Sequence, residues 1–310
     1  EQMAIADAEA KGVPTQGTTA YVTLEPCNHF GRTPPCTESL LWAGVERVVI
    51  GALDPNPTVR GDGAIALRDG GVEVESGLLE EECEEQMRPF MHWCRERRPM
   101  VTMKASTDSK GRIDGDPSKP ARRFSSQQSL DLAQGMRADS MAILVGVGTI
   151  VRDDPSLTVR GPELGPRDQP TRVVIDPRNR VPVDCRVMTD GEAPTLLVQS
   201  SEFETGDDHK HVERVVIPEN EMPITRILDM LGDRGVHSLL VEGGLDTWSR
   251  FLGSGMVDIV RTSVSPIEMP FEDAQRFDLA QLESLGFQPV SREIADGDEV
   301  TIWERPSKTD

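Results

Sequence analysis

The sequence of 310 residues lacks long apolar runs and is short of basic residues. No uninterrupted apolar stretch approaches the length that a membrane-spanning helix needs, so we expect no membrane partner. Lys and Arg number 33 against 53 Asp and Glu, which gives a formal net charge of -20. Because such a chain repels phosphate backbones, we expect no nucleic-acid partner either. Basic side chains must still converge wherever a single phosphate is bound.

Cysteine and histidine are also few, with five of each. An odd number of cysteines without regular spacing provides no disulfide framework, and this usage is typical of the reducing cytoplasm. The length, by contrast, is sufficient for two domains, each with its own core.

Two of the cysteines, Cys27 and Cys36, stand in the most informative segment of the chain. A Pro-Cys pair follows an apolar strand, and a second cysteine precedes a helix. A cysteine at a helix N-terminus has its thiolate stabilised by the helix dipole, and thiolates are preferred ligands of zinc. The spacing and context therefore favour a zinc site. A disulfide and two unrelated buried thiols are the alternatives.

In zinc-dependent base deaminases, two such cysteines share the metal with a histidine that lies two positions before a glutamate. That glutamate carries protons and is not a ligand. Here Glu1 is the candidate for it, and the first histidine of the chain is His29. We therefore expect the chain to begin inside a helix, with the third ligand ahead of Glu1.

Strands and helices alternate along the sequence, which predicts α/β domains with largely parallel sheets. A charge cluster followed by Pro99 separates a domain of residues 1–96 from one of residues 97–310. In the first domain we expect strands at 20–24, 45–53 and 72–75, and helices at 37–43, 64–69 and 79–95. In the second we expect strands at 100–104, 142–147, 172–176, 195–199, 212–217, 238–241 and 257–263, and helices at 127–138, 224–234 and 245–252.

The segment around the cysteines resembles the deaminase signature of the bifunctional riboflavin-biosynthesis deaminase–reductases. The matching runs are Thr-Leu-Glu-Pro-Cys-Asn-His at 23–29, Gly-Arg-Thr-Pro-Pro-Cys at 31–36 and Asp-Pro-Asn-Pro at 54–57. The resemblance implies a cytidine-deaminase-like α/β/α domain in which Cys27 and Cys36 bind Zn2+ and Glu1 is catalytic. It also implies that His29 and Arg32 contact the phosphoribosyl group of the substrate.

The second domain is similar to the reductase part of the same family over residues 137–149, 153–160, 172–176 and 241–244. The resemblance implies a dihydrofolate-reductase-like α/β domain rather than a dinucleotide-binding fold. The sequence agrees, because the Gly-x-Gly at 146–148 lacks the third glycine of a dinucleotide-binding turn. The residues that it implies for NADPH are Lys104, Thr149, Asp153, Gly243 and Gly244. The residues that it implies for the ribose phosphate are Arg137, Leu157, Arg160 and Glu242.

The residues themselves add two expectations for this half. Two glycines between a strand and a helix let backbone N–H groups approach a phosphate, and Thr149 at the end of a strand offers a hydroxyl to the cofactor. Asp153 is the first candidate for a catalytic proton relay. Two runs depart from the family pattern, Ser109-Lys110 and Arg123-Phe124, and both fall in the part of the chain that is expected to face the cofactor.

These features predict a two-step enzyme that deaminates a pyrimidine phosphoribosylamine with zinc and then reduces the ribose to a ribityl chain with NADPH. The family resemblance suggests a homo-oligomer that assembles through the reductase half. The alternatives are a reductase with a deaminase-like remnant, a non-catalytic protein that binds nucleotide phosphates, and a nucleic-acid deaminase. The acidic charge and the attached reductase-like half oppose the last of these.

Overall fold

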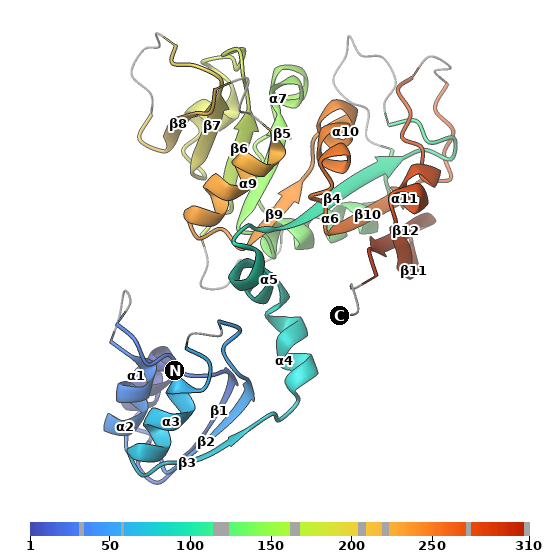
Figure 1. The fold of residues 1–310 in the computed structure, drawn as a ribbon. Helices are drawn as coiled ribbons and strands as arrows, with labels where there is room; N and C mark the ends of the chain where they lie inside the picture. The colour runs from blue at the N-terminus through green and yellow to red at the C-terminus, as the bar shows by residue number, and fades with distance from the viewer. Residues whose placement is uncertain are drawn as a thin grey trace. The chain divides into compact units, whose positions relative to one another are not determined.

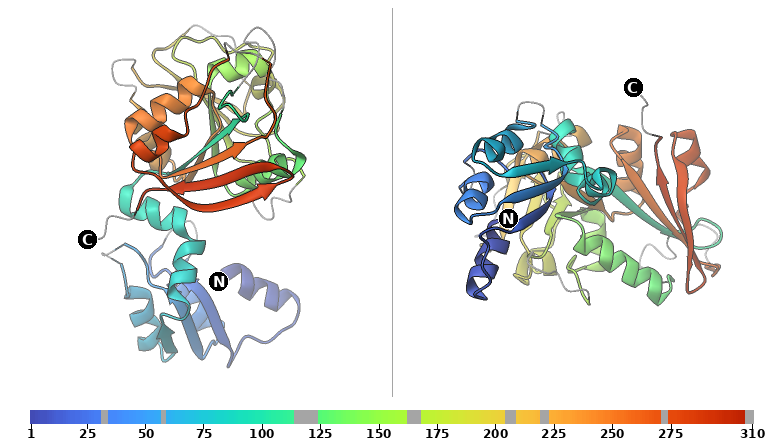
Figure 2. Two further views of the ribbon diagram at one scale, coloured as in Figure 1. Left: turned by 90° about the vertical axis from the view of Figure 1, so that its right-hand side faces the viewer. Right: turned by 90° about the horizontal axis from the view of Figure 1, so that it is seen from below.

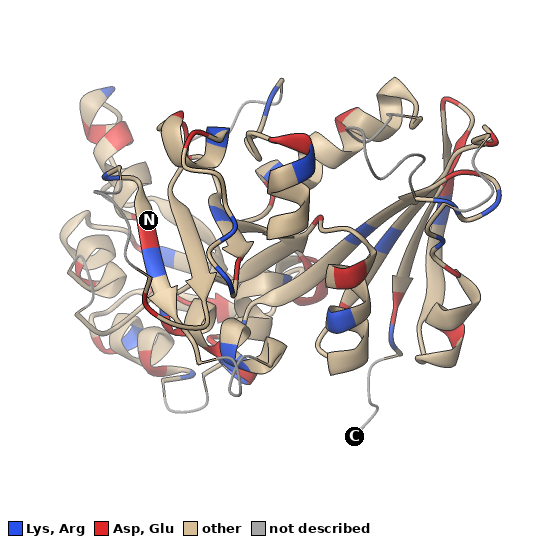
Figure 3. Ribbon diagram, turned by 90° about the horizontal axis from the view of Figure 1, so that it is seen from above, with Lys and Arg blue, Asp and Glu red and all other residues tan. Residues whose placement is uncertain are grey.

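The computed structural model describes residues 1–30, 34–56, 59–113, 124–161, 168–203, 209–218, 223–270 and 274–306. The chain divides into two compact units, Glu1–Glu96 and Arg97–Asp310, called unit 1 and unit 2 below (Figure 1). Basic residues are interspersed with acidic ones along the ribbon of each unit (Figure 3). Within the described ranges, no helix combines the length and the apolar character needed to span a bilayer.

Unit 1 contains a three-stranded parallel sheet in the order β1-β2-β3. The strands are β1 (Thr19–Leu24), β2 (Arg47–Ala52) and β3 (Glu73–Ser76), and the first three helices are α1 (Gln2–Ala10), α2 (Cys36–Trp42) and α3 (Asp62–Asp69). Parallel neighbours need crossover connections, which α2 and α3 supply. Apolar side chains of these helices pack on β2 in a core formed by Leu40, Val45, Val48, Ile50, Ala64, Leu67 and Val72.

The last part of unit 1 differs from the sequence prediction. A single helix was predicted over 79–95, but the structure has two, α4 (Glu80–Gln86) and α5 (Arg88–Glu96). The break falls at Met87, two residues before Pro89. A proline has no backbone N–H to continue a helix from the preceding turn, so a new helix begins there instead.

Unit 2 is built on one nine-stranded sheet in the order β11-β12-β10-β4-β9-β5-β6-β7-β8. The strands are β4 (Met100–Thr107), β5 (Ala142–Gly146), β6 (Thr171–Ile175), β7 (Thr195–Gln199), β8 (Val212–Val216), β9 (Ser238–Val241), β10 (Ile259–Val264), β11 (Gln288–Ala295) and β12 (Asp298–Glu304). Neighbouring strands are parallel except where β12 pairs with β10 and β11.

Both faces of this sheet are covered, so the strands in its middle bury apolar side chains on both sides, as β5 does with Ile143 and Leu144. One face packs against α9 (Ile224–Asp233), α10 (Leu245–Ser254) and α11 (Ala280–Ser284). The other packs against α6 (Gln127–Ala138), α7 (Val147–Asp153) and α8 (Arg186–Thr189). The result is a three-layer α/β/α arrangement (Figure 1).

The predicted strands and helices of unit 2 all form, but the sequence analysis missed its C-terminal hairpin. It placed no strand after residue 263, whereas β11 and β12 form an antiparallel pair at the edge of the sheet (Figure 2). The short helices α7, α8 and α11 were also missed. Every residue of β11 except Ala295 is exposed, so this strand has no buried face to produce an apolar alternation.

Candidate active sites

The structure brings Glu1, Cys27 and Cys36 together from three separate segments of unit 1. Cys27 follows β1, and Cys36 is the first residue of α2. The Cys27 Sγ accepts a hydrogen bond from the backbone N–H of Cys36 at 3.3 Å, and the side chain of Cys36 hydrogen-bonds to those of Glu1 and Cys27. Both cysteines are free thiols, so the disulfide alternative is wrong.

The electrostatics of this cluster suit a cation. Burial, the adjacent Glu1 carboxylate and Cys27 together raise the pKa of the Cys36 thiol to about 12. A divalent cation between the groups would act in the opposite sense, because it stabilises thiolates. Cys27 and Cys36 therefore fit the two thiolate positions of a zinc site. The described ranges contain no cluster of three or more His, Cys, Asp or Glu residues that would complete it.

A buried carboxylate that the sequence analysis did not single out holds the loops around this cluster. Glu25, directly before the Pro-Cys pair, accepts hydrogen bonds from the backbone amides of Asp54 at 3.1 Å, Gly61 at 2.9 Å and Ala64 at 3.0 Å. A side chain at Gly63 would collide with the carbonyl of Pro26. Glycine is therefore needed for α3 to approach the cysteine loop this closely.

The predicted substrate contacts of unit 1 are only partly described. His29 is exposed and lines a small cavity of about 50 Å³ together with Glu25, Cys27 and Asp54. Arg32 lies outside the described residues. The cysteine loop is held on this side by a hydrogen bond from the Thr37 hydroxyl to Asn28 Oδ1 at 2.9 Å.

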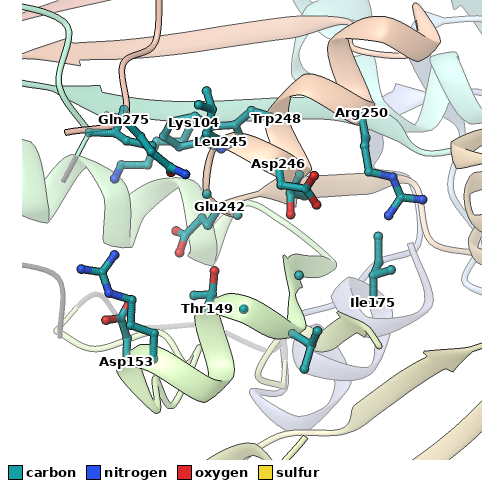
Figure 4. A pocket seen from close by; sticks show the side chains of 18 of the residues that line it. Lys104, Thr149, Asp153, Ile175, Glu242, Leu245, Asp246, Trp248, Arg250 and Gln275 are labelled. Atoms are coloured by element: carbon teal, nitrogen blue, oxygen red, sulfur yellow. The ribbon is translucent and has the colours of Figure 1, made fainter. Parts of the chain in front are cut away.

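Unit 2 contains a cavity of about 810 Å³ at the C-terminal ends of β4, β5, β6 and β9. This is where ligands bind in open parallel sheets. The five residues that were predicted to bind NADPH all line it: Lys104, Thr149, Asp153, Gly243 and Gly244. Glu242 lines it too and lies near its centre, between Lys104 and Thr149 (Figure 4).

One detail of that prediction is wrong, because Thr149 does not end a strand. Strand β5 ends at Gly146, and Thr149 lies in the helix α7 that follows at once. The Gly-x-Gly therefore forms the strand-to-helix junction and the first turn of α7. The threonine hydroxyl still reaches the cavity (Figure 4).

Glycine stands at three positions around the cavity for different physical reasons. A Cβ at Gly243 would lie 2.5 Å from Thr247 Cβ, and one at Gly146 would lie 2.7 Å from the Thr247 hydroxyl. Both are therefore needed for close packing against the first turn of α10. A Cβ at Gly244 would meet nothing within 4 Å, so this residue leaves open space at the N-terminus of the helix.

Glu242 and Lys104 line the cavity, and Arg137 pairs with Glu242. Arg137 donates from Nε to Glu242 Oε1 at 2.9 Å and from a second nitrogen to Oε2, and its Nη1 donates to the Thr158 carbonyl at 3.0 Å. Burial alone would raise the pKa of Glu242, but Arg137, Lys104 and Arg160 hold it below the usual carboxyl value. Burial lowers the pKa of Lys104, while the charge of Glu242 opposes that shift.

The remaining predicted substrate contacts lie apart from this cavity. Arg160 is exposed and lines a second cavity of about 770 Å³ with Thr158 and Arg186. The side chain of Leu157 packs in the apolar core, so only its backbone is available to a ligand. Of the two departures from the family pattern, Phe124 lines the larger cavity, whereas Arg123 lies outside the described residues and Ser109 and Lys110 do not line it.

Two buried polar atoms in the wall of the larger cavity support a ligand there. Within the described part of the chain, Ser106 Oγ and Trp248 Nε1 are buried without a hydrogen-bond partner. A buried polar atom that is left unsatisfied is costly, and a polar ligand would satisfy it. Together with the open backbone at Gly244, these atoms fit a nucleotide cofactor. Neither stands in a motif that would reveal it from the sequence.

Two family models match the chain, that of the RibD C-terminal domain over residues 99–270 and that of the cytidine and deoxycytidylate deaminase zinc-binding region over residues 1–52. The riboflavin biosynthesis protein RibD of Aquifex aeolicus is 36% identical over 266 residues, which cover 86% of this chain and 73% of that protein. The chain belongs to the RibD family. RibD of Escherichia coli is 36% identical over 268 residues, or 82% of this chain and 72% of its own length.

A solved structure agrees with this assignment. The crystal structure of a Thermotoga maritima diaminohydroxyphosphoribosylaminopyrimidine deaminase/5-amino-6-(5-phosphoribosylamino)uracil reductase superposes with a TM-score of 0.77 at 30% identity, over 97% of this chain and 83% of that one. RibD proteins join a zinc-dependent deaminase to an NADPH-dependent reductase. The predicted fold classes, pathway, enzyme class and cofactors are therefore confirmed.

Proposed function

We propose that unit 1 deaminates the diaminohydroxyphosphoribosylaminopyrimidine for which the Thermotoga protein is named, and that unit 2 reduces the ribose of the deaminated product. Each activity rests on one observation. For the deaminase it is the meeting of Glu1, Cys27 and Cys36 in space. For the reductase it is the single cavity that all five predicted NADPH residues line.

In the deaminase step, Cys27 and Cys36 would hold zinc, which when bound generates a hydroxide nucleophile at neutral pH. Hydrolysis replaces the exocyclic amino group by oxygen and releases ammonia. The Glu1 carboxylate, beside the Cys36 thiol, would carry the proton from the attacking water to the departing amine. His29 at the adjacent cavity and Arg32 would bind the phosphoribosyl group.

In the reductase step, NADPH supplies a hydride to the ribose carbon that becomes the end of the ribityl chain. Lys104 and Glu242 would position the sugar, because they bring a charged donor and acceptors to the cavity, and Arg137 would hold Glu242 in place. Arg160 would bind the phosphate. Asp153, at the C-terminal end of α7, is exposed in the wall of the cavity and remains the proposed proton relay (Figure 4).

A cysteine variant of the full-length protein tests the proposal. Cys27→Ser should abolish ammonia release from the aminopyrimidine substrate in the presence of zinc, and should leave NADPH oxidation with pre-deaminated substrate unchanged. Cys94→Ser, which alters a half-buried thiol of α5, is the matched control. If Cys27→Ser releases ammonia at the wild-type rate, the metal role of this residue is wrong.

We also propose a homo-oligomer that forms through unit 2, in the cytoplasm. Strand β11 is an edge strand with exposed Val290 and Ile294, and an edge strand is a natural template for pairing with a second copy. The free cysteines agree with a reducing compartment. Sedimentation of the full chain tests the assembly, and a monomer at micromolar concentration would contradict it.

A further inference from the structure

Two arginines in the wall of the larger cavity have no role in the family motifs described above. Arg178 and Arg180 lie in the loop after β6, both are exposed, and both line the cavity. Within the described residues, neither guanidinium has a hydrogen bond or an ion pair. The cavity therefore presents two uncompensated positive charges in a chain of net charge -20.

The loop that carries these arginines is fixed from within. The buried Asp176 accepts hydrogen bonds from the backbone amides of Arg180 and Val181, each at 2.9 Å. Asn179 has a left-handed φ of 51°, and its Oδ1 accepts hydrogen bonds from Gln199 Nε2 at 3.0 Å and from Arg214 Nη1 at 3.1 Å. The side chain of Asn179 is thereby held by the protein.

The residues on either side of Asn179 are consequently left exposed at the cavity. The loop presents Arg178 and Arg180 on a fixed backbone, so ordering the backbone costs nothing further when an anion binds.

The hydrogen bonds that fix the loop also occupy the Asp176 carboxylate, a group that could otherwise favour NADH. In the dinucleotide-binding fold, which unit 2 does not share, enzymes that use NAD place a carboxylate after a sheet strand, where it accepts a hydrogen bond from the ribose 2′-hydroxyl. Asp176 occupies a comparable place after β6, but it is fully buried and both of its oxygens accept backbone amides. It is therefore not available to a ribose hydroxyl.

We propose that Arg178 and Arg180 bind the 2′-phosphate of NADPH and set the preference of the reductase for NADPH over NADH. This inference rests on the proposed function, because it takes the cavity to be the cofactor site. A phosphate monoester carries about 1.5 to 2 negative charges at neutral pH, and guanidinium groups bind it in a bidentate manner. The cavity is also lined by Asp246, whose carboxylate would repel a phosphate, so the two arginines supply the charge that attracts one.

Isothermal titration calorimetry of the full chain with NADPH and with NADH tests the inference. In the double variant Arg178→Ala/Arg180→Ala, the Kd for NADPH should rise about tenfold to a hundredfold, which is the range expected for the loss of charge-assisted hydrogen bonds. The Kd for NADH should stay within about twofold, which also shows that the variant is folded. Arg226→Ala, which removes an exposed arginine of α9 outside the cavity, is the control for net charge and should leave both values unchanged.

The outcomes separate this inference from the proposed function. If the double variant binds both cofactors with wild-type affinity, or loses both by the same factor, the arginines do not read the 2′-phosphate. If the wild-type chain binds neither NADPH nor NADH, the assignment of the cavity as the cofactor site fails, and the inference fails with it.

Discussion

Arg172 is the largest side chain that the described residues bury completely, and its ion pair predicts a measurable share of the stability of unit 2. Its Nη1 donates to both oxygens of Asp190 at 2.8 Å and to the Ser156 carbonyl at 3.2 Å. Its Nε donates to Thr195 Oγ1 at 2.9 Å, and its Nη2 donates to the Ala193 carbonyl at 2.7 Å. One guanidinium thus joins strand β6 to three other segments.

Replacing this side chain by an apolar one of similar length leaves its acceptors without donors. In Arg172→Met, the Asp190 carboxylate, whose side chain is 16% exposed, becomes an unpaired and mostly buried charge. Breaking a buried pair in this way costs about 3–5 kcal/mol of unfolding free energy. Arg172→Lys keeps the charge but loses the planar fork, so we expect a smaller loss of about 1–3 kcal/mol.

Urea unfolding monitored by hydrogen exchange of peptides from β5, β6 and β7 measures this loss in unit 2 alone. Peptides from unit 1 serve as the internal reference and should keep their midpoint. Adding Asp190→Asn to Arg172→Met should recover part of the loss, because the uncompensated charge is then removed. A loss below about 1 kcal/mol in Arg172→Met, or a fully additive double variant, would refute the reasoning.

Two further predictions concern a cavity residue and a loop support. Burial lowers the pKa of Lys104, so the reductase kcat/KM should fall at alkaline pH with a midpoint below the usual lysine pKa of about 10.4. In Lys104→Arg this fall should move to higher pH. A pH–rate profile of the variant that is identical to that of the wild type would contradict the prediction. Glu25→Gln should destabilise unit 1 by about 1–3 kcal/mol, because an amide replaces an acceptor of three backbone N–H groups. Thermal unfolding checks it against Glu9→Gln, an exposed control on α1 that should have no effect.

Some of the strands that the sequence predicted correctly are buried along most of their length. The last four residues of β6 and all five of β7 are buried, and each strand contains a run of three apolar residues, although β6 also buries Arg172. The opposite holds for β11, in which Val290 and Ile294 are 59% and 67% exposed. A strand whose position depends on backbone pairing with β12 alone leaves no periodic signal in its side chains.

The candidate sites divide in the same way. Cys27 and Cys36 could be singled out by their spacing and context, and Glu1 by the family resemblance. Glu25 and Ser106 could not be singled out in this way. The role of Glu25 depends on the distant backbone amides whose hydrogen bonds it accepts, and that of Ser106 depends on the absence of a hydrogen-bond partner for its buried hydroxyl. The sequence gives no local sign of either condition.

Four parallel strands that lead to the sites end in the same way. The residue directly after the strand is acidic in each: Glu25 after β1, Asp108 after β4, Asp176 after β6 and Glu242 after β9. The first three are buried and accept backbone amides, and in Asp108 the amides of Met269 and Arg112, aided by the Arg112 guanidinium, outweigh burial and lower its pKa. Each holds a loop in place through these hydrogen bonds.

Glu242 is the exception, and the identity of its partner shows why. It pairs with the Arg137 side chain rather than with backbone amides, and it lines the cavity beside Lys104. A carboxylate whose oxygens all accept backbone amides cannot engage a substrate without releasing its loop, whereas a carboxylate held by one side chain keeps lone pairs for a ligand. The type of donor, which only the structure reveals, thus separates three structural carboxylates from the one that we propose binds substrate.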